Sequence, residues 1–133
     1  MKRKILSLAA MVLTTISSNA QSHAFKSLTV EAYEQAIADT TVIRLDVRTS
    51  EEFAAGHIDH AINIDVLKPD FEQRAASILP RSKTIAINCR SGKRSKRAAQ
   101  LLVRHGYRVI ELDSGYLGWV AAGKKIVFEN CNL

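Results

Sequence analysis

The stretch at residues 88–95, which reads NCRSGKRS, holds residue types that could do chemistry. It contains one thiol, Cys89, and three cations, Arg90, Lys93 and Arg94. A thiolate is the nucleophilic form of cysteine, and nearby cations and a helix N-terminus stabilise it. Gly92 gives the backbone access to angles that other residues resist, so successive N–H groups can turn inward to hold an anion. The stretch therefore predicts a thiolate at the floor of an anion-binding loop; the simpler alternative is a solvated basic turn with an incidental cysteine.

The spacing between cysteine and arginine separates two enzyme classes that use such a loop. Cysteine phosphatases have the arginine six positions after the nucleophile, where this chain has Ser95. Arg94 lies five positions after Cys89, which makes a shorter loop. A guanidinium matches tetrahedral oxyanions such as sulfonate, phosphate and arsenate, but the shorter loop fits one sulfur atom on the cysteine better than a whole phosphoryl group. We therefore expect sulfur transfer, with a cysteine phosphatase or arsenate reductase as the less favoured alternative.

Short apolar runs alternate with amphipathic stretches from residue 27 onward. Strands that alternate with helices are typical of an α/β fold. We expect a mostly parallel central sheet of about five short strands, flanked by helices on both faces. Cys89 follows a strand directly and Ser95 begins the next helix, at the carboxyl edge where such sheets bind ligands. The predicted strands are 41–47, 61–64, 84–88 and 108–112, and the predicted helices are 30–38, 49–56, 70–80, 95–106 and 116–123.

Capping residues support several of these helix ends. Thr29 is the expected N-cap of the first helix. Thr49 and Glu52 have the spacing of a capping box, and Gly56 fits the position just after the end of that short helix. Pro80 ends the helix that begins at residue 70.

The first twenty residues have the layout of a cleaved secretory signal peptide. Basic residues at 2–4 precede an apolar run at 5–16, and small residues stand at Ser18 and Ala20. Ala24 offers a second cleavage point. An uncleaved membrane anchor is the alternative, which we disfavour because the apolar run is too short for a span.

Cleavage after Ala20 would leave one domain of modest size. It would also lower the formal net charge of +6 by three, because three basic residues leave with the peptide. We expect a periplasmic protein with no membrane contact after cleavage. The basic cluster could bind nucleic acid, but we expect no nucleic-acid partner, because export removes the protein from nucleic acid and no aromatic residue lies within the cluster. The predicted organisation is a signal peptide at 1–20, a short segment at 21–26, one domain at 27–128 and a tail at 129–133.

Three segments resemble, in order, the motifs of the single-domain rhodanese (thiosulfate sulfurtransferase) family. They are RLDVRTSEEFAAGHIDHAINI at 44–64, CRSGKRS at 89–95 and GYLGW at 115–119. They are spread over residues 44–119, which is most of the chain that would follow the signal peptide. The departures are Asp59-His60 where the family often has Pro-Gly, Ser114-Gly115 in place of Gly-Gly, and no proline after the last helix. These departures bear on local loop shape.

The resemblance implies a rhodanese-like fold and a two-step sulfur exchange that needs no cofactor. The Cys89 thiolate would attack the outer sulfur of thiosulfate, expel sulfite and become a persulfide, from which cyanide or a thiol would take the sulfur. Asp46 and Arg48 would organise the site, although a structural ion pair at a strand end explains them equally well. The resemblance assigns substrate binding to Arg90, Ser91, Gly92, Lys93, Arg94 and Ser95, with Arg90 and Lys93 the expected ligands of the sulfonate.

Histidine and the second cysteine also bear on this chemistry. His57 as a base for Cys89 is disfavoured, because the leaving group of thiosulfate needs no general acid. The four histidines are scattered, so no metal site is expected. Cys131, the second cysteine, could form a disulfide with Cys89 in an oxidising compartment, or could resolve an oxidised or persulfidated Cys89.

The expected partners are therefore small molecules: thiosulfate, cyanide or thiols. We expect a monomer. An alternative of another class is a non-catalytic sulfane-sulfur carrier or thiol redox partner. A persulfide on Cys89 without turnover of small donors would favour that alternative.

Overall fold

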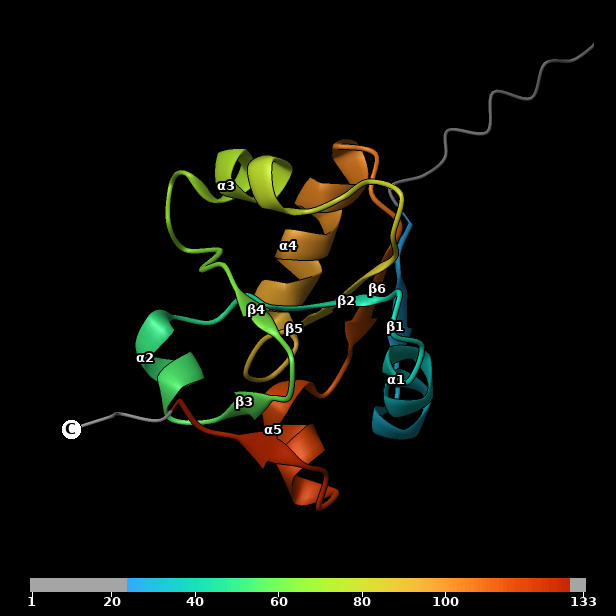
Figure 1. The fold of residues 1–133 in the computed structure, drawn as a ribbon, viewed down its shortest axis with the longest axis vertical. Helices are drawn as coiled ribbons and strands as arrows, with labels where there is room; N and C mark the ends of the chain where they lie inside the picture. The colour runs from blue at the N-terminus through green and yellow to red at the C-terminus, as the bar shows by residue number, and fades with distance from the viewer. Residues whose placement is uncertain (1–23, 130–133) are drawn as a thin grey trace, which may run out of the picture.

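The computed structural model describes residues 24–129, so the predicted signal peptide and Cys131 lie outside the described residues. A central sheet of five strands runs through the molecule (Figure 1), with strand order β1-β6-β5-β2-β4 and every neighbouring pair parallel. This confirms the predicted sheet. Its strands are β1 (Lys26–Leu28), β2 (Ile43–Asp46), β4 (Ile62–Asn63), β5 (Ile85–Asn88) and β6 (Val109–Leu112).

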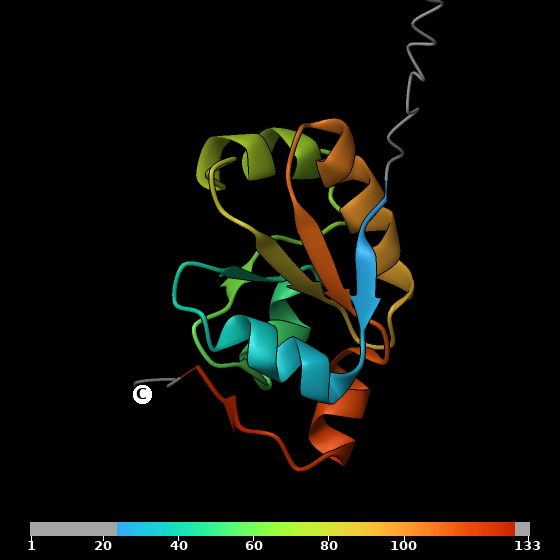
Figure 2. The same ribbon diagram turned by 90° about the vertical axis from the view of Figure 1, so that its right-hand side faces the viewer.

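Helices cover both faces of this sheet, as predicted. The helices α3 and α4 lie on one face, and α1 and α5 lie on the other (Figures 1 and 2). The helices are α1 (Val30–Ile37), α2 (Ser50–Ala54), α3 (Phe71–Ile78), α4 (Lys93–Arg104) and α5 (Gly115–Ala121). A small antiparallel pair, β3 (His57–Ile58) with β7 (Ile126–Val127), was not predicted.

The central strand β5 explains why two separate cores form. All four of its residues are buried, and successive side chains of a strand point to opposite faces. Ile85 and Ile87 pack into the core under α3 and α4, while Ala86 packs into the core under α1 and α5. A strand buried on both faces reads as a continuous apolar run, which is why β5 lacks polar alternation.

The predicted caps of two helices are confirmed. Thr29 accepts a hydrogen bond from the backbone N–H of Ala32 at 3.2 Å. Thr49 and Glu52 form the full capping box at the start of α2. Among residues 24–129, no helix is both long and apolar enough to cross a membrane.

The helix after the cysteine begins two residues earlier than predicted. It was expected to begin near Ser95, but α4 begins at Lys93 with Gly92 as its N-cap. Gly92 has a φ of 101°, and this left-handed conformation turns the chain sharply enough for the helix to begin at once. The cysteine loop is therefore shorter, and Ser95 lies inside the first turn of the helix.

Candidate active site

Cys89 is held at the floor of a tight loop between β5 and α4. Its side chain is buried, with 1% exposed. A Cβ atom placed on Gly92 would come within 2.1 Å of the backbone oxygen of Asp113, so only glycine allows the loop to pass this close to the neighbouring strand. This close approach is the physical reason why the bend of the loop needs glycine at position 92.

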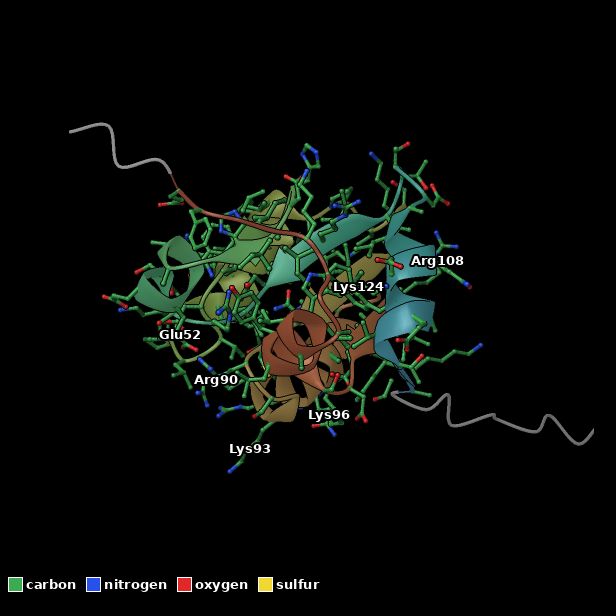
Figure 3. The ribbon with its side chains drawn as sticks, turned by 90° about the horizontal axis from the view of Figure 1, so that it is seen from below. Glu52, Arg90, Lys93, Lys96, Arg108 and Lys124 are labelled. Carbon is green, nitrogen blue, oxygen red and sulfur yellow. The ribbon has the colours of Figure 1, made fainter. Side chains whose placement is uncertain are left out.

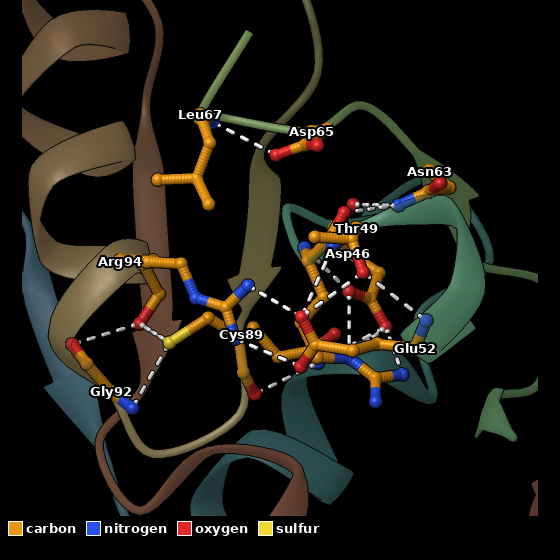
Figure 4. Close-up of polar contacts among 12 residues, drawn as sticks. Asp46, Thr49, Glu52, Asn63, Asp65, Leu67, Cys89, Gly92 and Arg94 are labelled. Carbon is orange, nitrogen blue, oxygen red and sulfur yellow. Dashed lines mark hydrogen bonds and ion pairs between the residues drawn. The ribbon is translucent and has the colours of Figure 1, made fainter. Parts of the chain in front are cut away.

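Two groups contact the sulfur of Cys89. The backbone N–H of Gly92 donates to Sγ at 3.0 Å, as Figure 4 shows. The Sγ donates to the hydroxyl of Ser95 at 3.4 Å. The N-terminus of α4 points toward the same sulfur, and its partial positive charge stabilises a thiolate there. Ser95 therefore lies on the inner side of the thiol, fully buried, rather than at the mouth of the loop.

Arg94 ties the loop to helix α2. Its guanidinium donates two parallel hydrogen bonds to Glu52, at 2.7 Å and 2.9 Å (Figure 4). These bonds lower the pKa of Glu52 to about 2, against opposing desolvation, and they raise the pKa of Arg94. Glu52 also accepts from Thr49, so one carboxylate caps α2 and holds the active loop. Of these two roles, only the capping of α2 was predicted from the sequence.

Asp46 and Arg48 form a buried ion pair at the carboxyl end of β2. Their side chains lie 2.7 Å apart, and 0% of Asp46 and 3% of Arg48 are exposed. Arg48 also donates to the backbone oxygen of Gly56 and lies 4.1 Å from the ring centre of Tyr116. Among residues 24–129, neither side chain of the pair makes a hydrogen bond or ion pair with Cys89.

The start of α5 fixes the backbone of the loop. Tyr116 N–H donates to the backbone oxygen of Cys89 at 2.8 Å, and Leu117 N–H donates to that of Arg90 at 3.0 Å. Gly115 makes this approach possible: its φ is 65°, and a Cβ there would come within 2.4 Å of the Arg90 oxygen. The sequence analysis noted this segment only as part of the resemblance and predicted no contact for Gly115. The feature that could have indicated the close approach is the glycine kept at 115, where the family has a Gly-Gly pair.

The outer side of the loop is cationic and open. Arg90, Ser91 and Lys93 are exposed, and Lys93 points away from the ribbon in Figure 3. Within the described part of the chain, Arg90 and Lys93 have no ion pair. Lys96, by contrast, contacts Glu111 and Asp113, each at 2.8 Å.

His57 lies apart from the thiol. Its ring stacks on Phe53 at 3.6 Å between ring centres, and its Nδ1 is 2.8 Å from the backbone oxygen of the same residue. These contacts account for its burial without a role beside Cys89. Within residues 24–129 there is no cluster of three His, Cys, Asp or Glu side chains that could hold a metal ion.

One cavity lies away from this loop. It has a volume of about 350 Å³ and contains no residue of the segment 89–95. Its walls come from the start of β2, the end of α1 and the edge strand β4. The lining residues are Ile37, Thr40, Val42, Ile43, Arg44, His60 and Ile62.

Comparisons with known proteins agree with this architecture. The model of the Rhodanese-like domain matches residues 29–122. A sulfurtransferase of Allochromatium vinosum is 35% identical over 99 residues, which cover 73% of this chain and 90% of that protein. A rhodanese-related protein of Thermoplasma volcanium, of known crystal structure, superposes with a TM-score of 0.70 at 28% identity, covering 79% of this chain and all of that one.

Two relatives from Arabidopsis thaliana carry names that mention thiosulfate or arsenic. Thiosulfate sulfurtransferase 16, chloroplastic, is 36% identical over 59% of this chain and 74% of its own length. Protein HIGH ARSENIC CONTENT 1, mitochondrial, is 38% identical over 59% of this chain. The chain spans about half of the length of that second relative, 53%.

Proposed function

The chain belongs to the rhodanese-like domain family, and from that premise we propose that it is a thiosulfate sulfurtransferase that carries sulfur as a persulfide on Cys89. The observation that carries the proposal is the geometry of the sulfur: Sγ accepts a hydrogen bond from the Gly92 N–H at 3.0 Å at the N-terminus of α4. Arg90 and Lys93 belong to the same segment and have no ion pair within the described part of the chain. This arrangement supports a nucleophile for an anionic substrate.

The first half-reaction moves one sulfur atom onto the enzyme. The Cys89 thiolate attacks the outer sulfur of thiosulfate, a sulfur–sulfur bond forms at Sγ, and the bond to the sulfonate sulfur breaks with its electron pair. Sulfite leaves, and the negative charge moves to the outer sulfur of the persulfide. Arg90 and Lys93 bind the sulfonate at the mouth; their exposure, and their lack of an ion pair with any residue from 24 to 129, support this role.

The second half-reaction returns the enzyme to its starting form. Cyanide attacks the outer sulfur, thiocyanate leaves, and the bonding pair returns to Sγ as the thiolate. A thiol acceptor reacts in the same way, as its thiolate, and becomes a persulfide. Between the two steps, we assign the backbone N–H groups of the loop to hold the outer sulfur of the persulfide.

A thiosulfate-plus-cyanide assay tests this proposal. Wild-type protein should form thiocyanate, and the Cys89→Ser variant should lose turnover by at least about a thousandfold, because no persulfide can form. Mass spectrometry of wild-type protein after thiosulfate should show one added sulfur on the peptide that contains Cys89. Full activity in Cys89→Ser would refute the nucleophile assignment. A persulfide without thiocyanate formation would instead identify a sulfur carrier.

Arsenate reduction is the second candidate, and one observation favours it. Protein HIGH ARSENIC CONTENT 1 is 38% identical to this chain over 89 residues, and arsenate is a tetrahedral oxyanion that suits the same cations. Arsenate with a thiol reductant, and a phosphate ester, belong beside thiosulfate in the assay. Turnover of arsenate faster than of thiosulfate would replace the first proposal.

The location of the protein is a proposal from residues 1–20 alone. We propose export to a periplasm with cleavage after Ala20, so that the exported protein begins at residue 21. We also propose that it is a monomer. Sequencing the N-terminus of protein from the periplasmic fraction tests this, and an intact Met1 in the cytoplasmic fraction would overturn it.

A further inference from the structure

A carboxylate without exposed surface lies behind the active loop. Glu111 belongs to β6, the strand beside β5, and 0% of its side chain is exposed. A buried charge is costly unless it is paired and hydrogen-bonded. Lys96 Nζ lies 2.8 Å from one carboxylate oxygen, and the hydroxyl of Ser27, its partner on β1, donates to that same oxygen. Nothing in the proposed sulfur exchange uses Glu111.

Two hydrogen bonds connect Glu111 to the thiol. Ser95 Oγ lies 2.7 Å from the second carboxylate oxygen of Glu111, and Cys89 Sγ lies 3.4 Å from Ser95 Oγ. All three side chains are buried, with 1% or less exposed. Carboxylate, hydroxyl and sulfur therefore form a continuous buried chain.

The direction in which the Ser95 hydroxyl donates its single proton decides how this hydrogen-bonded chain affects Cys89. The hydroxyl can donate once, and two oxygens compete: Glu111 at 2.7 Å and the backbone oxygen of Gly92 at 3.1 Å. The carboxylate is nearer and charged, and charge-assisted hydrogen bonds are the stronger kind. The proton therefore points to Glu111, and Ser95 faces the sulfur of Cys89 as an acceptor.

An acceptor beside Sγ has opposite effects on the forms of Cys89. It stabilises the thiol, whose S–H it accepts, but it cannot donate to the thiolate, which keeps the Gly92 N–H. In a persulfide, Sγ is a neutral bridging sulfur and the negative charge lies on the outer sulfur. The acceptor then no longer faces a charge.

We propose that Glu111 is a positioning residue that, through Ser95, disfavours negative charge on Sγ of Cys89 and thereby favours the sulfur-loaded form over the free thiolate. The preference for the loaded form rests on the proposed function, whereas the effect on the thiolate does not. The other titratable or charged groups around the two ends of this hydrogen-bonded chain are Arg90 in the loop, Lys93, Arg94 and Lys96 on α4, Tyr33 on α1, Asp46 on β2, and Asp113 after β6.

The rate of alkylation of Cys89 as a function of pH tests the effect on the thiolate. The reaction with iodoacetamide is followed by mass spectrometry of the peptide that contains Cys89, which separates it from Cys131. In Glu111→Gln, an amide can donate to Ser95 and free the hydroxyl proton for the thiolate. The pH of half-maximal rate should fall by about one unit, the size of one ordinary hydrogen bond.

Asp113→Asn is the matched control. Asp113 contacts the same Lys96 at 2.8 Å but is exposed and, among the described residues, makes no contact with Ser95. The pH profile of Cys89 alkylation in Asp113→Asn should match that of the wild type. Far-UV circular dichroism and thermal unfolding report whether each variant is folded.

A double-mutant cycle separates action through Ser95 from a direct effect of charge. In a Ser95→Ala background, Glu111→Gln should lose most of its effect on the alkylation profile. An equal shift in both backgrounds, or no shift in Glu111→Gln, would overturn the inference.

The persulfide equilibrium tests the second half of the proposal. At a fixed ratio of thiosulfate to sulfite, and at a pH above both alkylation midpoints, the ratio of persulfide to free Cys89 should fall about tenfold in Glu111→Gln, which corresponds to a shift of one pH unit. An unchanged ratio would reject the preference for the loaded form. Wild-type protein that takes up no sulfur would overturn the proposed function, while the alkylation profile would still decide the role of Glu111.

Discussion

The cations that follow Cys89 are close together in sequence but differ in what they contact. Arg94 is held by two hydrogen bonds to Glu52, and Lys96 contacts two carboxylates. Arg90 and Lys93 are exposed and, among residues 24–129, have no ion pair. At the residue scale, these two are the cations that an incoming anion can use without breaking an existing pair.

Replacing Arg90 or Lys93 by alanine should weaken substrate binding. We expect the KM for thiosulfate to rise roughly tenfold for each variant, with a smaller change in kcat, because a charge-assisted hydrogen bond to the anion is lost. Lys83→Ala is the matched control, since Lys83 is exposed at the opposite end of β5 and its loss changes the net charge equally. The difference in KM between the Arg90 or Lys93 variant and the wild type should shrink at high salt. An equal rise in KM for all three variants would point to net charge instead.

At the scale of elements, the carboxylate of Glu52 connects α2 to α4. Glu52 caps α2 through Thr49 and holds Arg94 in the first turn of α4. The Asp46–Arg48 pair connects the end of β2 to Gly56, just after α2. The loop is therefore held between elements that are distant in sequence.

The pH dependence of stability should report the contact between Glu52 and Arg94. The folded-state pKa of Glu52 is about 2, below its ordinary value of 4.5. A lowered carboxyl pKa stabilises the fold above pH 4.5, and this contribution is lost as the pH falls from 4.5 toward 2. Urea unfolding over this range should show a shallower loss of stability in Glu52→Gln than in the wild type.

Glu51→Gln provides the comparison for this measurement. Glu51 lies beside Glu52 in the first turn of α2, where both meet the same helix dipole, but it is exposed and lacks Arg94 as a partner. Its stability profile should follow the wild type between pH 4.5 and pH 2. If Glu51→Gln and Glu52→Gln flatten the profile equally, the ion pair is not the cause.

At the scale of the whole molecule, the site is assembled from four separate parts of the chain. Cys89 comes from the centre of the sheet, Glu52 from α2, Glu111 from β6, and Tyr116 from α5. The helix α5 packs on the face of the sheet opposite to α4, yet its first N–H groups hold the backbone of Cys89 and Arg90. Packing on both faces of the sheet therefore sets the position of one loop.

Gly115→Ala tests this long-range support. A side chain at φ 65° costs about 1–2 kcal/mol by conformation alone, and a Cβ there would also press on the Arg90 oxygen at 2.4 Å. Gly123→Ala is the control, because Gly123 has a similar φ of 71° with nothing within 4 Å. Chemical unfolding should show a larger loss of stability in Gly115→Ala, and turnover of thiosulfate should fall only there. Equal losses in the two variants would mean that the close approach to the loop is unimportant.

The sequence by itself predicted four strands of the central sheet, the five helices, and the position of Cys89 directly after a strand. Apolar runs such as 84–88 identify buried strands because a strand covered on both faces must be apolar, and Thr49 with Glu52 identified a helix start because capping is a local contact. Cys89 was placed at the carboxyl edge of the sheet for the same local reason. Only the tertiary structure decided that Arg94 is held by Glu52, that Gly115 lets α5 approach the loop, and that Glu111 reaches Ser95 behind the thiol. These pairs lie 16 to 42 residues apart or come from different layers, so their contacts depend on the order and register of the strands, which no local pattern of residues specifies.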